Sequence, residues 1–169
     1  MQSRLWNIDK DYDTLVRWWT QWEFGIVPKE CLPPDGIIVE DDNGVPIAGG
    51  GLYIGVGTKF AFMEWVIIED LAFNKQKEGN KGLDPRTAHK ALNLCIDSIM
   101  KLAESKGMKL VFTATKVKGL HKRYTKYHKM TLAESDVKTF LRDFTGNYSK
   151  NLNWVSDDTQ IKKQKEETE

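Results

Sequence analysis

The chain has 169 residues, with 25 Lys and Arg against 24 Asp and Glu, so its formal net charge is +1. This length suits one domain with a single buried core, and 40% hydrophobic with 29% charged residues is a globular composition. The balanced charge excludes a chain that is basic throughout, and Cys31 and Cys95 are too few for a disulfide framework. No apolar run reaches the about 18–20 residues of a membrane span, and residues 1–4 lead into no signal-peptide core. We therefore expect a soluble, cytoplasmic protein with no membrane partner.

The first part of the chain predicts a short strand followed by an amphipathic helix. Residues 3–8 are expected to form the strand. Asp9 or Asp11 can cap the helix, because a carboxylate accepts hydrogen bonds from the free amides of a first turn. Apolar side chains then recur at helical spacing: Tyr12, Leu15, Val16, Trp19 and Trp22. Gly25 is the expected stop, and the proline-containing residues 26–35 are expected to form a loop.

Residues 36–73 predict an antiparallel meander of three strands. The run 36–40 leads into Asp42-Asn43-Gly44, and an Asn-Gly pair tolerates the positive φ of a two-residue turn. The return strand, 45–56, holds three consecutive glycines, which weaken a strand unless a bulge or a close approach requires them. The third segment, 59–73, is dense in aromatic and β-branched residues.

The middle of the chain predicts a loop, a long helix and a strand. Residues 74–84 carry lysines and glycines, and Asp84-Pro85 places an acid at the helix cap and a proline at the first helical position. Apolar residues keep the helical period up to Gly107, a glycine of the kind that ends helices. The run 109–115 predicts a buried strand, and a strand–loop–helix–strand unit implies parallel pairing.

The last part of the chain is less regular. Residues 117–128 predict a helix with Leu120, Tyr124 and Tyr127 on one face, whereas 137–144 fits either a strand or a short helix. The end of the chain, from residue 156 on, has eight charged residues in fourteen and cannot bury enough apolar surface to offset the entropy of ordering. We therefore expect a single domain over residues 1–155 and a charged, disordered tail over residues 156–169.

The order of these elements resembles the GCN5-related N-acetyltransferase (GNAT) family over about residues 2–145. Residues 37–50 (IIVEDDNGVPIAGG) resemble the second and third strands of the family, and residues 65–73 (WVIIEDLAF) its fourth strand, which lines the acetyl-CoA cleft. Residues 79–84 (GNKGLD) lie where the family has Arg/Gln-x-x-Gly-x-Gly/Ala. Residues 120–130 (LHKRYTKYHKM) resemble the segment that usually contains Leu-Tyr-x-Lys-x-Gly-Phe.

The resemblance implies an α/β fold with an α+β mixed sheet. An antiparallel N-terminal meander is followed by a β–loop–α–β unit, and the central sheet is splayed. It also implies acetyl-CoA as the co-substrate. The residues expected to bind it are Leu71, Ala72, Phe73, Lys77, Gly79, Asn80, Lys81, Gly82, Leu83, Asp84 and Thr115.

The glycine-lysine loop before the long helix has chemistry that suits a pyrophosphate. Such a group needs several backbone N–H donors, which glycines and a helix N-terminus supply. Lys77 and Lys81 add positive charge, whereas the Asp84 carboxylate repels phosphate oxygens unless it turns inward as the helix cap. Gly79 and Asp84 depart from the family pattern, and a solvated loop before a capped helix is the alternative interpretation.

Acetyl transfer needs a base for the amine and a proton donor for the leaving thiolate. An amine with a pKa near 10.4 is neutral in about one molecule in a few thousand at pH 7. The resemblance implies that Tyr124 is the donor, with Tyr127 as the alternative. Glu69 and Glu64 are candidate bases of opposite parity, so only one can face the cleft on a regular strand, and we prefer Glu69. A bulge, common in this strand of the family, could change that choice.

The first helix of the family and the loop after it border the acceptor site. The resemblance therefore implies that Trp18, Trp22 and Phe24 bind the substrate. Trp19 and Trp22 fit the buried stripe of the helix, whereas Trp18 is expected to project outward. Core packing or a homodimer contact is the alternative role of these aromatic residues.

These observations favour an N-acyltransferase that moves an acetyl group from acetyl-CoA to a primary amine by direct attack in a ternary complex. The acceptor is a small molecule or a protein. The departures at Gly79 and Asp84 motivate an alternative, a GNAT-like binding or regulatory protein without turnover. Residues 116–129, with six Lys and Arg and no acid, suggest a nucleic-acid binder, which is less expected because such a face is usually solvated. The histidines and cysteines lack metal-ligand spacing, so we expect no metal site.

Overall fold

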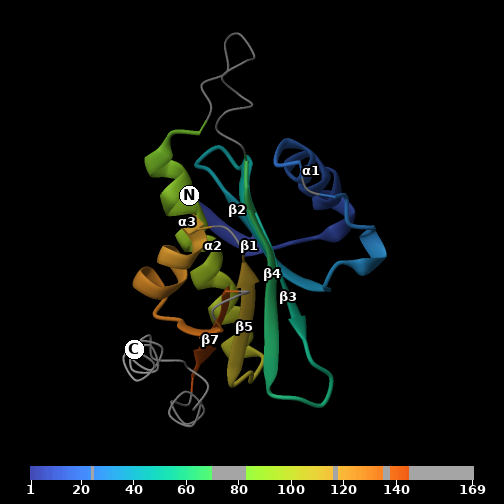
Figure 1. The fold of residues 1–169 in the computed structure, drawn as a ribbon. Coiled ribbons are helices and arrows are strands. Elements are labelled where there is room, and N and C mark those ends of the chain that lie inside the picture. Colours follow the sequence, from blue (N-terminus) through green and yellow to red (C-terminus); the bar gives the residue numbers. More distant parts are fainter. Residues whose placement is uncertain (24, 70–82, 116–117, 135–137, 145–169) are drawn as a thin grey trace, which may run out of the picture.

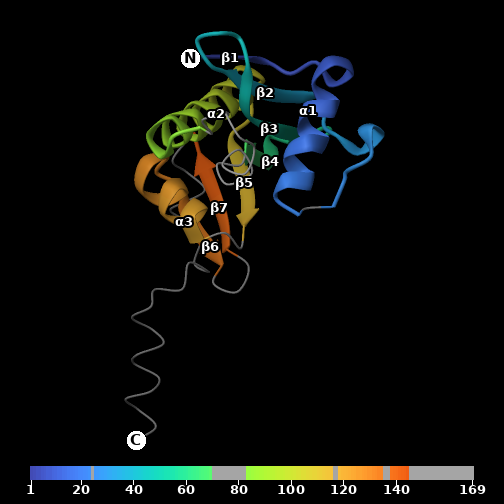
Figure 2. The ribbon, with the colours of Figure 1, turned by 90° about the horizontal axis from the view of Figure 1, so that it is seen from above.

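The computed structural model describes residues 1–23, 25–69, 83–115, 118–134 and 138–144. Within these residues a seven-stranded sheet has the order β1-β2-β3-β4-β5-β7-β6. Helix α1 lies on one face of the sheet, and α2 and α3 lie on the other (Figures 1 and 2). The expectations for residue 24, for residues 70–82 and for the tail from residue 156 on lie outside the described residues.

The elements follow the predicted order with one strand added. They are β1 (Gln2–Leu5), α1 (Ile8–Gln21), the 3-10 turn η1 (Lys29–Cys31), β2 (Asp35–Glu40), β3 (Pro46–Ile54), β4 (Phe60–Ile68), α2 (Pro85–Ser105), β5 (Leu110–Thr115), α3 (Lys118–Lys122), the π-helical turn η3 (Arg123–Tyr127), β6 (Thr131–Glu134) and β7 (Lys138–Asp143). Strands β2 to β4 pair antiparallel, as the meander predicts, and β1 pairs antiparallel with β2. Strands β4 and β5 pair parallel, as the β–loop–α–β unit predicts. Strand β7 resolves the ambiguity at 137–144, and β6 was not predicted.

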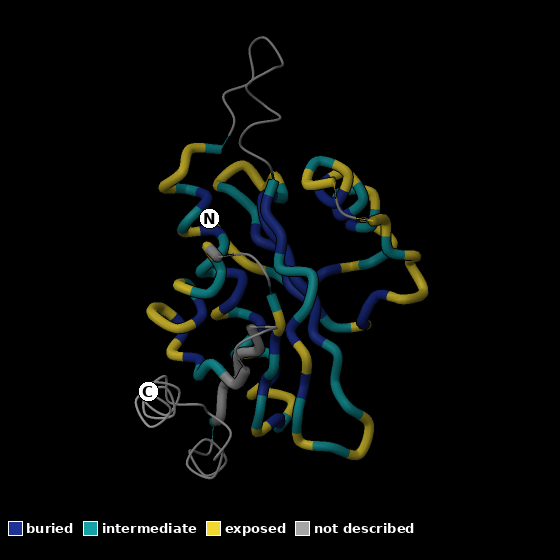
Figure 3. Tube along the Cα trace, viewed as in Figure 1, coloured by how far each residue is buried: buried dark blue, intermediate teal, exposed yellow. Residues whose placement is uncertain are grey.

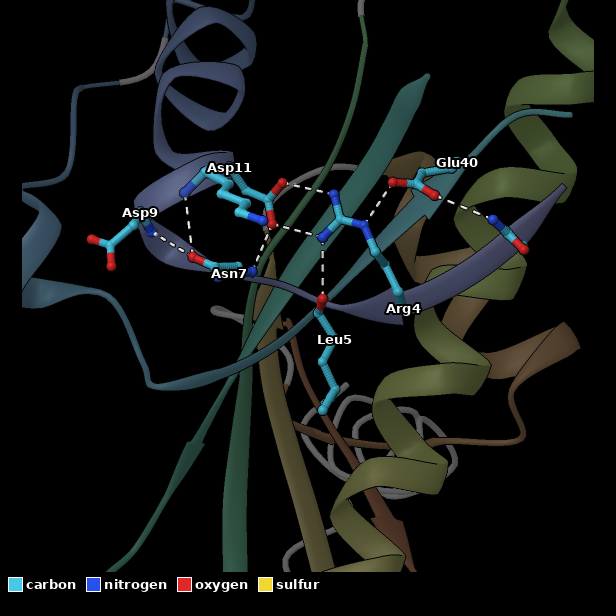
Figure 4. A network of polar contacts seen from close by, with 8 residues as sticks. Arg4, Leu5, Asn7, Asp9, Asp11 and Glu40 are labelled. Atoms are coloured by element: carbon cyan, nitrogen blue, oxygen red, sulfur yellow. Dashed lines mark hydrogen bonds and ion pairs between the residues drawn. The ribbon is translucent and has the colours of Figure 1, made fainter. Parts of the chain in front are cut away.

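The start of α1 is held by a polar network that differs from the predicted cap (Figure 4). Asn7, rather than Asp9 or Asp11, is the N-cap, and its side chain accepts hydrogen bonds from the first-turn amides at 3.1 and 3.3 Å. Asp11 is already engaged, because both of its oxygens accept from the Arg4 guanidinium at 2.8 Å. Arg4 also donates to Glu40 at 2.6 Å. This network joins β1, α1 and β2, and the helix ends at Gln21, before Gly25.

The β2–β3 turn is longer than the predicted two-residue turn. Gly44 has the positive φ, at 78°, and the Asp41 amide donates to the Val45 carbonyl at 2.9 Å. The Asp41 carboxylate accepts from the amides of Asn43 and Val45 at 2.8 and 2.9 Å. Because this side chain binds the backbone of the turn, it favours a three-residue loop that ends in glycine.

The three glycines of β3 lie where both layers press closely on the sheet. A Cβ atom on Gly49 would lie 3.0 Å from Ile38 Cδ1, and one on Gly50 would lie 2.8 Å from Ile99 Cδ1. A Cβ atom on Gly51 would lie 2.6 Å from both Pro33 Cγ and Trp6. The close approach that could justify these glycines is therefore confirmed, and it brings α1 and α2 near the centre of the sheet.

Helix α2 begins and ends as the sequence predicts. The Asp84 carboxylate accepts from the Arg86 and Thr87 amides at 2.9 and 3.1 Å. At the other end, Gly107 has a φ of 74°, and its amide donates to the Glu104 carbonyl at 2.9 Å. The helix packs Cys95 and its apolar neighbours into the larger core cluster, against β2 to β5, and buried residues follow these strands (Figure 3). No helix among the described residues is long and apolar enough to cross a membrane.

The predicted helix over 117–128 is divided into two short parts. α3 is a single helical turn, and η3 follows it with π-helical geometry. Tyr124 is buried with 1% of its surface exposed, whereas Tyr127 is 46% exposed. The two tyrosines therefore do not share one buried face, because the wider π turn rotates the second away from the core.

Candidate active site

The central feature of the sheet is a gap between β4 and β5. The two strands pair at three positions, which join Phe60 to Leu110, Ala61 to Val111 and Phe62 to Phe112. Beyond Phe62 no further pair joins them in the described part of the sheet. A cavity of about 240 Å³ lies at this divergence. The splayed central sheet expected from the sequence is therefore confirmed.

A bulge in β4 determines which side chains reach the gap. Gly49 pairs with Ile67 and Gly51 pairs with Glu64, so two residues of β4, Trp65 and Val66, lie opposite Gly50. Trp65 has a positive φ of 59°, which is unusual for a bulky side chain and marks the bulge. The extra residue changes the alternation of the strand, so positions of opposite parity before and after it can share a face.

The cavity is lined from both faces of the sheet. Its lining residues are Trp19, Met63, Glu64, Trp65, Val66, Ile67, Thr113, Ala114, Thr115, Leu120 and Tyr124. Met63 and Tyr124 belong to the core cluster under α2, whereas Trp19 and Ile67 belong to the cluster under α1. Glu64 lies on the α1 side, because its neighbour Met63 packs on the α2 side.

The two ionisable groups of the cavity have shifted pKa values. Burial raises the pKa of the Glu64 carboxyl above its ordinary value. Burial also raises the pKa of Tyr124 well above its usual range, and a hydrogen bond with Thr113 only partly opposes this effect. The negative charge of Glu64 raises the pKa of Tyr124 further. Tyr124 therefore keeps its proton at neutral pH, and Glu64 holds protons more readily than an exposed carboxyl.

Many solved structures resemble this architecture, and three of them illustrate the similarity. Aminoglycoside 6'-acetyltransferase type Ii has a TM-score of 0.62 at 11% identity, over 85% of this chain and 97% of that chain. A GNAT-family acetyltransferase from Staphylococcus aureus Mu50 has a TM-score of 0.57 at 9% identity, over 84% and 98%. Rv2747 from Mycobacterium tuberculosis, solved in complex with CoA and NLQ, has a TM-score of 0.57 at 15% identity, over 80% and 74%.

The chain has the GNAT acetyltransferase fold. The fold expected from the order of the elements is thus confirmed by structural similarity. No protein-family model matches the sequence, and no curated protein matches it.

Within this GNAT fold the two candidate bases have different surroundings. Glu64 lines the cavity, whereas Glu69 follows the end of β4 and pairs with Arg17 of α1 at 3.8 Å. The stated preference for Glu69 over Glu64 therefore has no support from the geometry of the cavity. The bulge explains this arrangement of the two glutamates. It places both carboxylates toward α1 and leaves Glu64 at the point where β4 and β5 diverge.

The tryptophans of α1 are arranged differently from the prediction. Trp18 is fully buried and does not project outward. It can therefore influence a substrate site only by supporting residues that line it. Trp22 is 42% exposed, and its indole N–H donates to the Ile68 carbonyl at 2.7 Å. Trp19 reaches the cavity and packs edge-to-face on Trp65, with ring centroids 5.8 Å apart. The buried stripe includes Leu15, Trp18 and Trp19, so Trp18 follows Leu15 at a three-residue spacing on the same helix face.

Few of the expected cofactor-binding residues of the GNAT fold lie in the described part of the chain. The expectations for Leu71, Ala72, Phe73, Lys77, Gly79, Asn80, Lys81 and Gly82 lie outside the described residues. Thr115 lines the cavity, and Leu83 packs against the larger core cluster. Asp84 is exposed and caps α2, and its carboxylate also accepts a hydrogen bond from the Thr87 hydroxyl. Its carboxylate therefore engages two of the helix amides that a phosphate could otherwise bind.

Most residues that line the cavity were not predicted from the sequence, and Thr113 and Trp65 are two of them. Thr113 hydrogen-bonds Tyr124, and the signal for it was a polar residue at a buried position of the strand 109–115. Trp65 lines the cavity because of its positive φ, for which the sequence offers no local signal. No group of three His, Cys, Asp or Glu that could hold a metal ion was found among the described residues.

Proposed function

We propose that the protein is a cytoplasmic N-acyltransferase that transfers an acetyl group from acetyl-CoA to a primary amine by direct attack in a ternary complex. One observation carries the proposal. Glu64 and Tyr124 line a single cavity at the point where β4 and β5 separate. The similar solved structures support it, because two of those reported are acetyltransferases and another contains CoA.

The separated strands suit the amide-containing arm of acetyl-CoA. Beyond Phe62 the inner edge of β4 has no β5 partner within the described sheet, so its backbone groups can pair with amides of a ligand. Thr115 and Ala114 of β5 line the opposite side of the same cavity. The Asp84 carboxylate is a local obstacle for the phosphates, because it already accepts from two amides of α2.

The two ionisable side chains account for the movement of protons in the transfer. The amine nitrogen bonds to the acetyl carbon, the carbon–sulfur bond breaks, and the nitrogen loses one proton. Glu64 accepts this proton, and the raised pKa that burial gives the carboxyl brings it closer to that of an effective base at neutral pH. Tyr124 keeps its proton at neutral pH and donates a hydrogen bond to the leaving sulfur. Tyr124 then passes its proton to the sulfur, which leaves as the thiol, and Tyr124 and Glu64 return to their starting states by exchanging protons with solvent.

Two measurements test this proposal in sequence. Calorimetry with acetyl-CoA first tests binding, and the absence of binding at high micromolar concentration contradicts the proposal. Release of free thiol with a panel of primary amines then tests turnover. The assay is best run on Cys31→Ser, because Cys31 is an exposed thiol that reacts with the same reagents, whereas burial raises the pKa of Cys95 to about 12.

The position of Asp84 favours a second candidate, a GNAT-like binding or regulatory protein without turnover. In this case acetyl-CoA binds and no amine in the panel releases thiol. A phosphate site weakened by Asp84 gives low affinity with normal turnover at saturation, so the concentration dependence of thiol release distinguishes the two candidates.

A further inference from the structure

Three phenylalanine rings form a strip on the α1 face of the sheet, beside the cavity. Phe60 and Phe62 belong to β4 and Phe112 to β5, and we call these three residues the aromatic strip. The centroids of Phe62 and Phe112 are 5.6 Å apart with an interplanar angle of 31°, and Phe60 packs edge-to-face on both. Ala61 and Val111, between them in sequence, are buried in the core under α2, so the strip faces the other way.

The strip is only partly covered by the described structure. Phe62 is 42% exposed, although neighbouring strand residues are fully buried. The core cluster under α1 contains Trp6, Trp18 and Ile67 but none of the three phenylalanines. Phe60 and Phe112 are half-buried, so the strip offers one exposed ring backed by two others, and apolar surface of this kind beside a cavity is characteristic of a binding site.

The strip leads directly to the candidate base. Glu64 is two residues beyond Phe62 on β4, and Ala114 is two residues beyond Phe112 on β5, so both share the face of the strip. Glu64 and Ala114 line the cavity, and Ala114 is exposed with a side chain too small to close the passage. Two residues of a strand span about 6.6 Å, which is the separation of a ring and an amine joined by a short linker.

We propose that the aromatic strip binds the acceptor, and that the acceptor is a primary amine joined by a short linker to an aromatic ring. This inference rests on the proposed N-acyltransferase function and specifies its substrate. The rings stack on the aromatic part of the acceptor, and the Glu64 carboxylate at the end of the strip attracts the cationic amine. A second copy of the chain, or another part of the same chain, is the competing occupant of the strip.

The test compares 2-phenylethylamine with ethylamine as acceptors in the thiol-release assay. We expect kcat/KM to be at least about tenfold higher for 2-phenylethylamine, because the ring adds apolar contact that ethylamine lacks. Phe62→Ala removes most of this preference by raising KM for 2-phenylethylamine, and leaves ethylamine within about twofold. Val45→Ala is the matched control, because Val45 is 48% exposed and lies on the β2–β3 turn, away from the strip. It leaves the preference unchanged.

A binding measurement separates the inference from the proposed function. Calorimetry of 2-phenylethylamine with the acetyl-CoA-free protein gives weaker binding for Phe62→Ala than for Val45→Ala if the strip is the acceptor site. If Phe62→Ala does not fold, Phe62→Leu replaces it in the test, because leucine keeps an apolar side chain at this position. Leucine has no ring, so this variant also weakens the preference for 2-phenylethylamine.

Several results overturn the inference. If kcat/KM is equal for 2-phenylethylamine and ethylamine, the inference about the acceptor is wrong, but the proposed acyltransferase function stands. If no amine in the panel releases thiol, the proposed function is wrong as well. If Phe62→Ala turns a dimer into a monomer in light scattering without changing the preference, the strip is a contact between copies. A lower thermal midpoint with an unchanged preference shows that the ring packs against its own chain.

Discussion

Glu64 and Tyr124 face one cavity from opposite sides of the sheet. Glu64 lies on the α1 side of β4, and Tyr124 belongs to the core under α2 and hydrogen-bonds Thr113. The negative charge of Glu64 contributes to the raised pKa of Tyr124, so the two groups interact across the gap. A proton acceptor and a proton donor are thereby held apart by the width of the sheet, with the reacting atoms expected between them.

Tyr124→Phe tests the proton-donor role. The substitution keeps the buried ring and removes only the hydroxyl, so we expect kcat to fall by about 10²-fold while the affinity for acetyl-CoA changes by less than about threefold. Stopped assays of thiol release give kcat, and calorimetry gives the affinity. Thr113→Val is the companion variant, because it removes the hydrogen-bond partner of Tyr124 and leaves the hydroxyl in place, so its effect should be smaller. An unchanged kcat in Tyr124→Phe assigns the donor role elsewhere.

Glu64→Gln and Glu69→Gln distinguish the two candidate bases. The amide cannot accept the proton from the amine, so we expect Glu64→Gln to lower kcat/KM by about 10²-fold or more. Glu69 pairs with Arg17 outside the cavity lining, and its substitution should have the smaller effect. Because burial raises the pKa of Glu64, the activity of the native protein rises with pH through this raised value, and the acid limb disappears in Glu64→Gln. If Glu69→Gln lowers kcat/KM more than Glu64→Gln does, Glu69 is the base.

The same pKa shift predicts an effect of Glu64 on stability. A carboxyl whose pKa is raised by folding binds its proton more tightly in the folded state, so its contribution to stability is present at low pH and is lost as the pH rises through the folded-state value. At pH 7 the native carboxylate is therefore destabilising, and Glu64→Gln should raise the urea midpoint of unfolding. The difference should vanish below the ordinary pKa of glutamate. A variant that is less stable than the native protein at pH 7 contradicts the desolvation of Glu64.

Gly36→Ala tests the close packing of α1 and the first strands on the sheet. A Cβ atom on Gly36 would lie 2.2 Å from Trp6 Cε2, and the buried Trp6 ring donates to the Pro34 carbonyl at 3.3 Å. We expect a loss of about 2–3 kcal/mol in the free energy of unfolding, because the ring must move. Gly119→Ala on α3 is the control, since no atom lies within 4 Å of its Cβ position, and it should be neutral or slightly stabilising. If chemical denaturation gives the same change in the free energy of unfolding for Gly36→Ala and Gly119→Ala, this close packing is contradicted.

The sequence was sufficient for the elements whose signals are local. The Asp84 cap, the Gly107 stop and the parallel strand 109–115 follow from capping chemistry and periodicity, and the structure confirms all three. Features set by tertiary contacts were not predicted. Trp65 adopts a positive φ only because β4 is bulged against β3, and the orientation of Trp18 depends on the rotation of α1 on the sheet. The choice between Glu69 and Glu64 remains a prediction, and the bulge removes the argument that only one of them can face the cleft, because that argument assumed a regular strand.

Helix stability and phosphate binding compete at Asp84, the N-cap of α2. A hydrogen bond from the Thr87 hydroxyl, followed by those from the amides of Thr87 and Arg86, holds the pKa of Asp84 below its usual range. Asp84→Asn keeps a good cap and removes the charge, so we expect an unchanged thermal midpoint and a several-fold higher affinity for acetyl-CoA. Asp84→Ala removes both the cap and the charge, so the thermal midpoint should fall by roughly 2–4 °C while the affinity for acetyl-CoA still increases.

Glu104→Gln, near the other end of α2, is the charge-matched control and should leave the affinity unchanged. Calorimetry at two salt concentrations completes the test, because the gain in Asp84→Asn should shrink as salt screens the repulsion between the native carboxylate and the phosphates. If Asp84→Asn binds acetyl-CoA no more tightly than the native protein at low salt, the phosphates do not approach this end of α2. The capped helix is then purely structural, as the alternative interpretation of the loop holds.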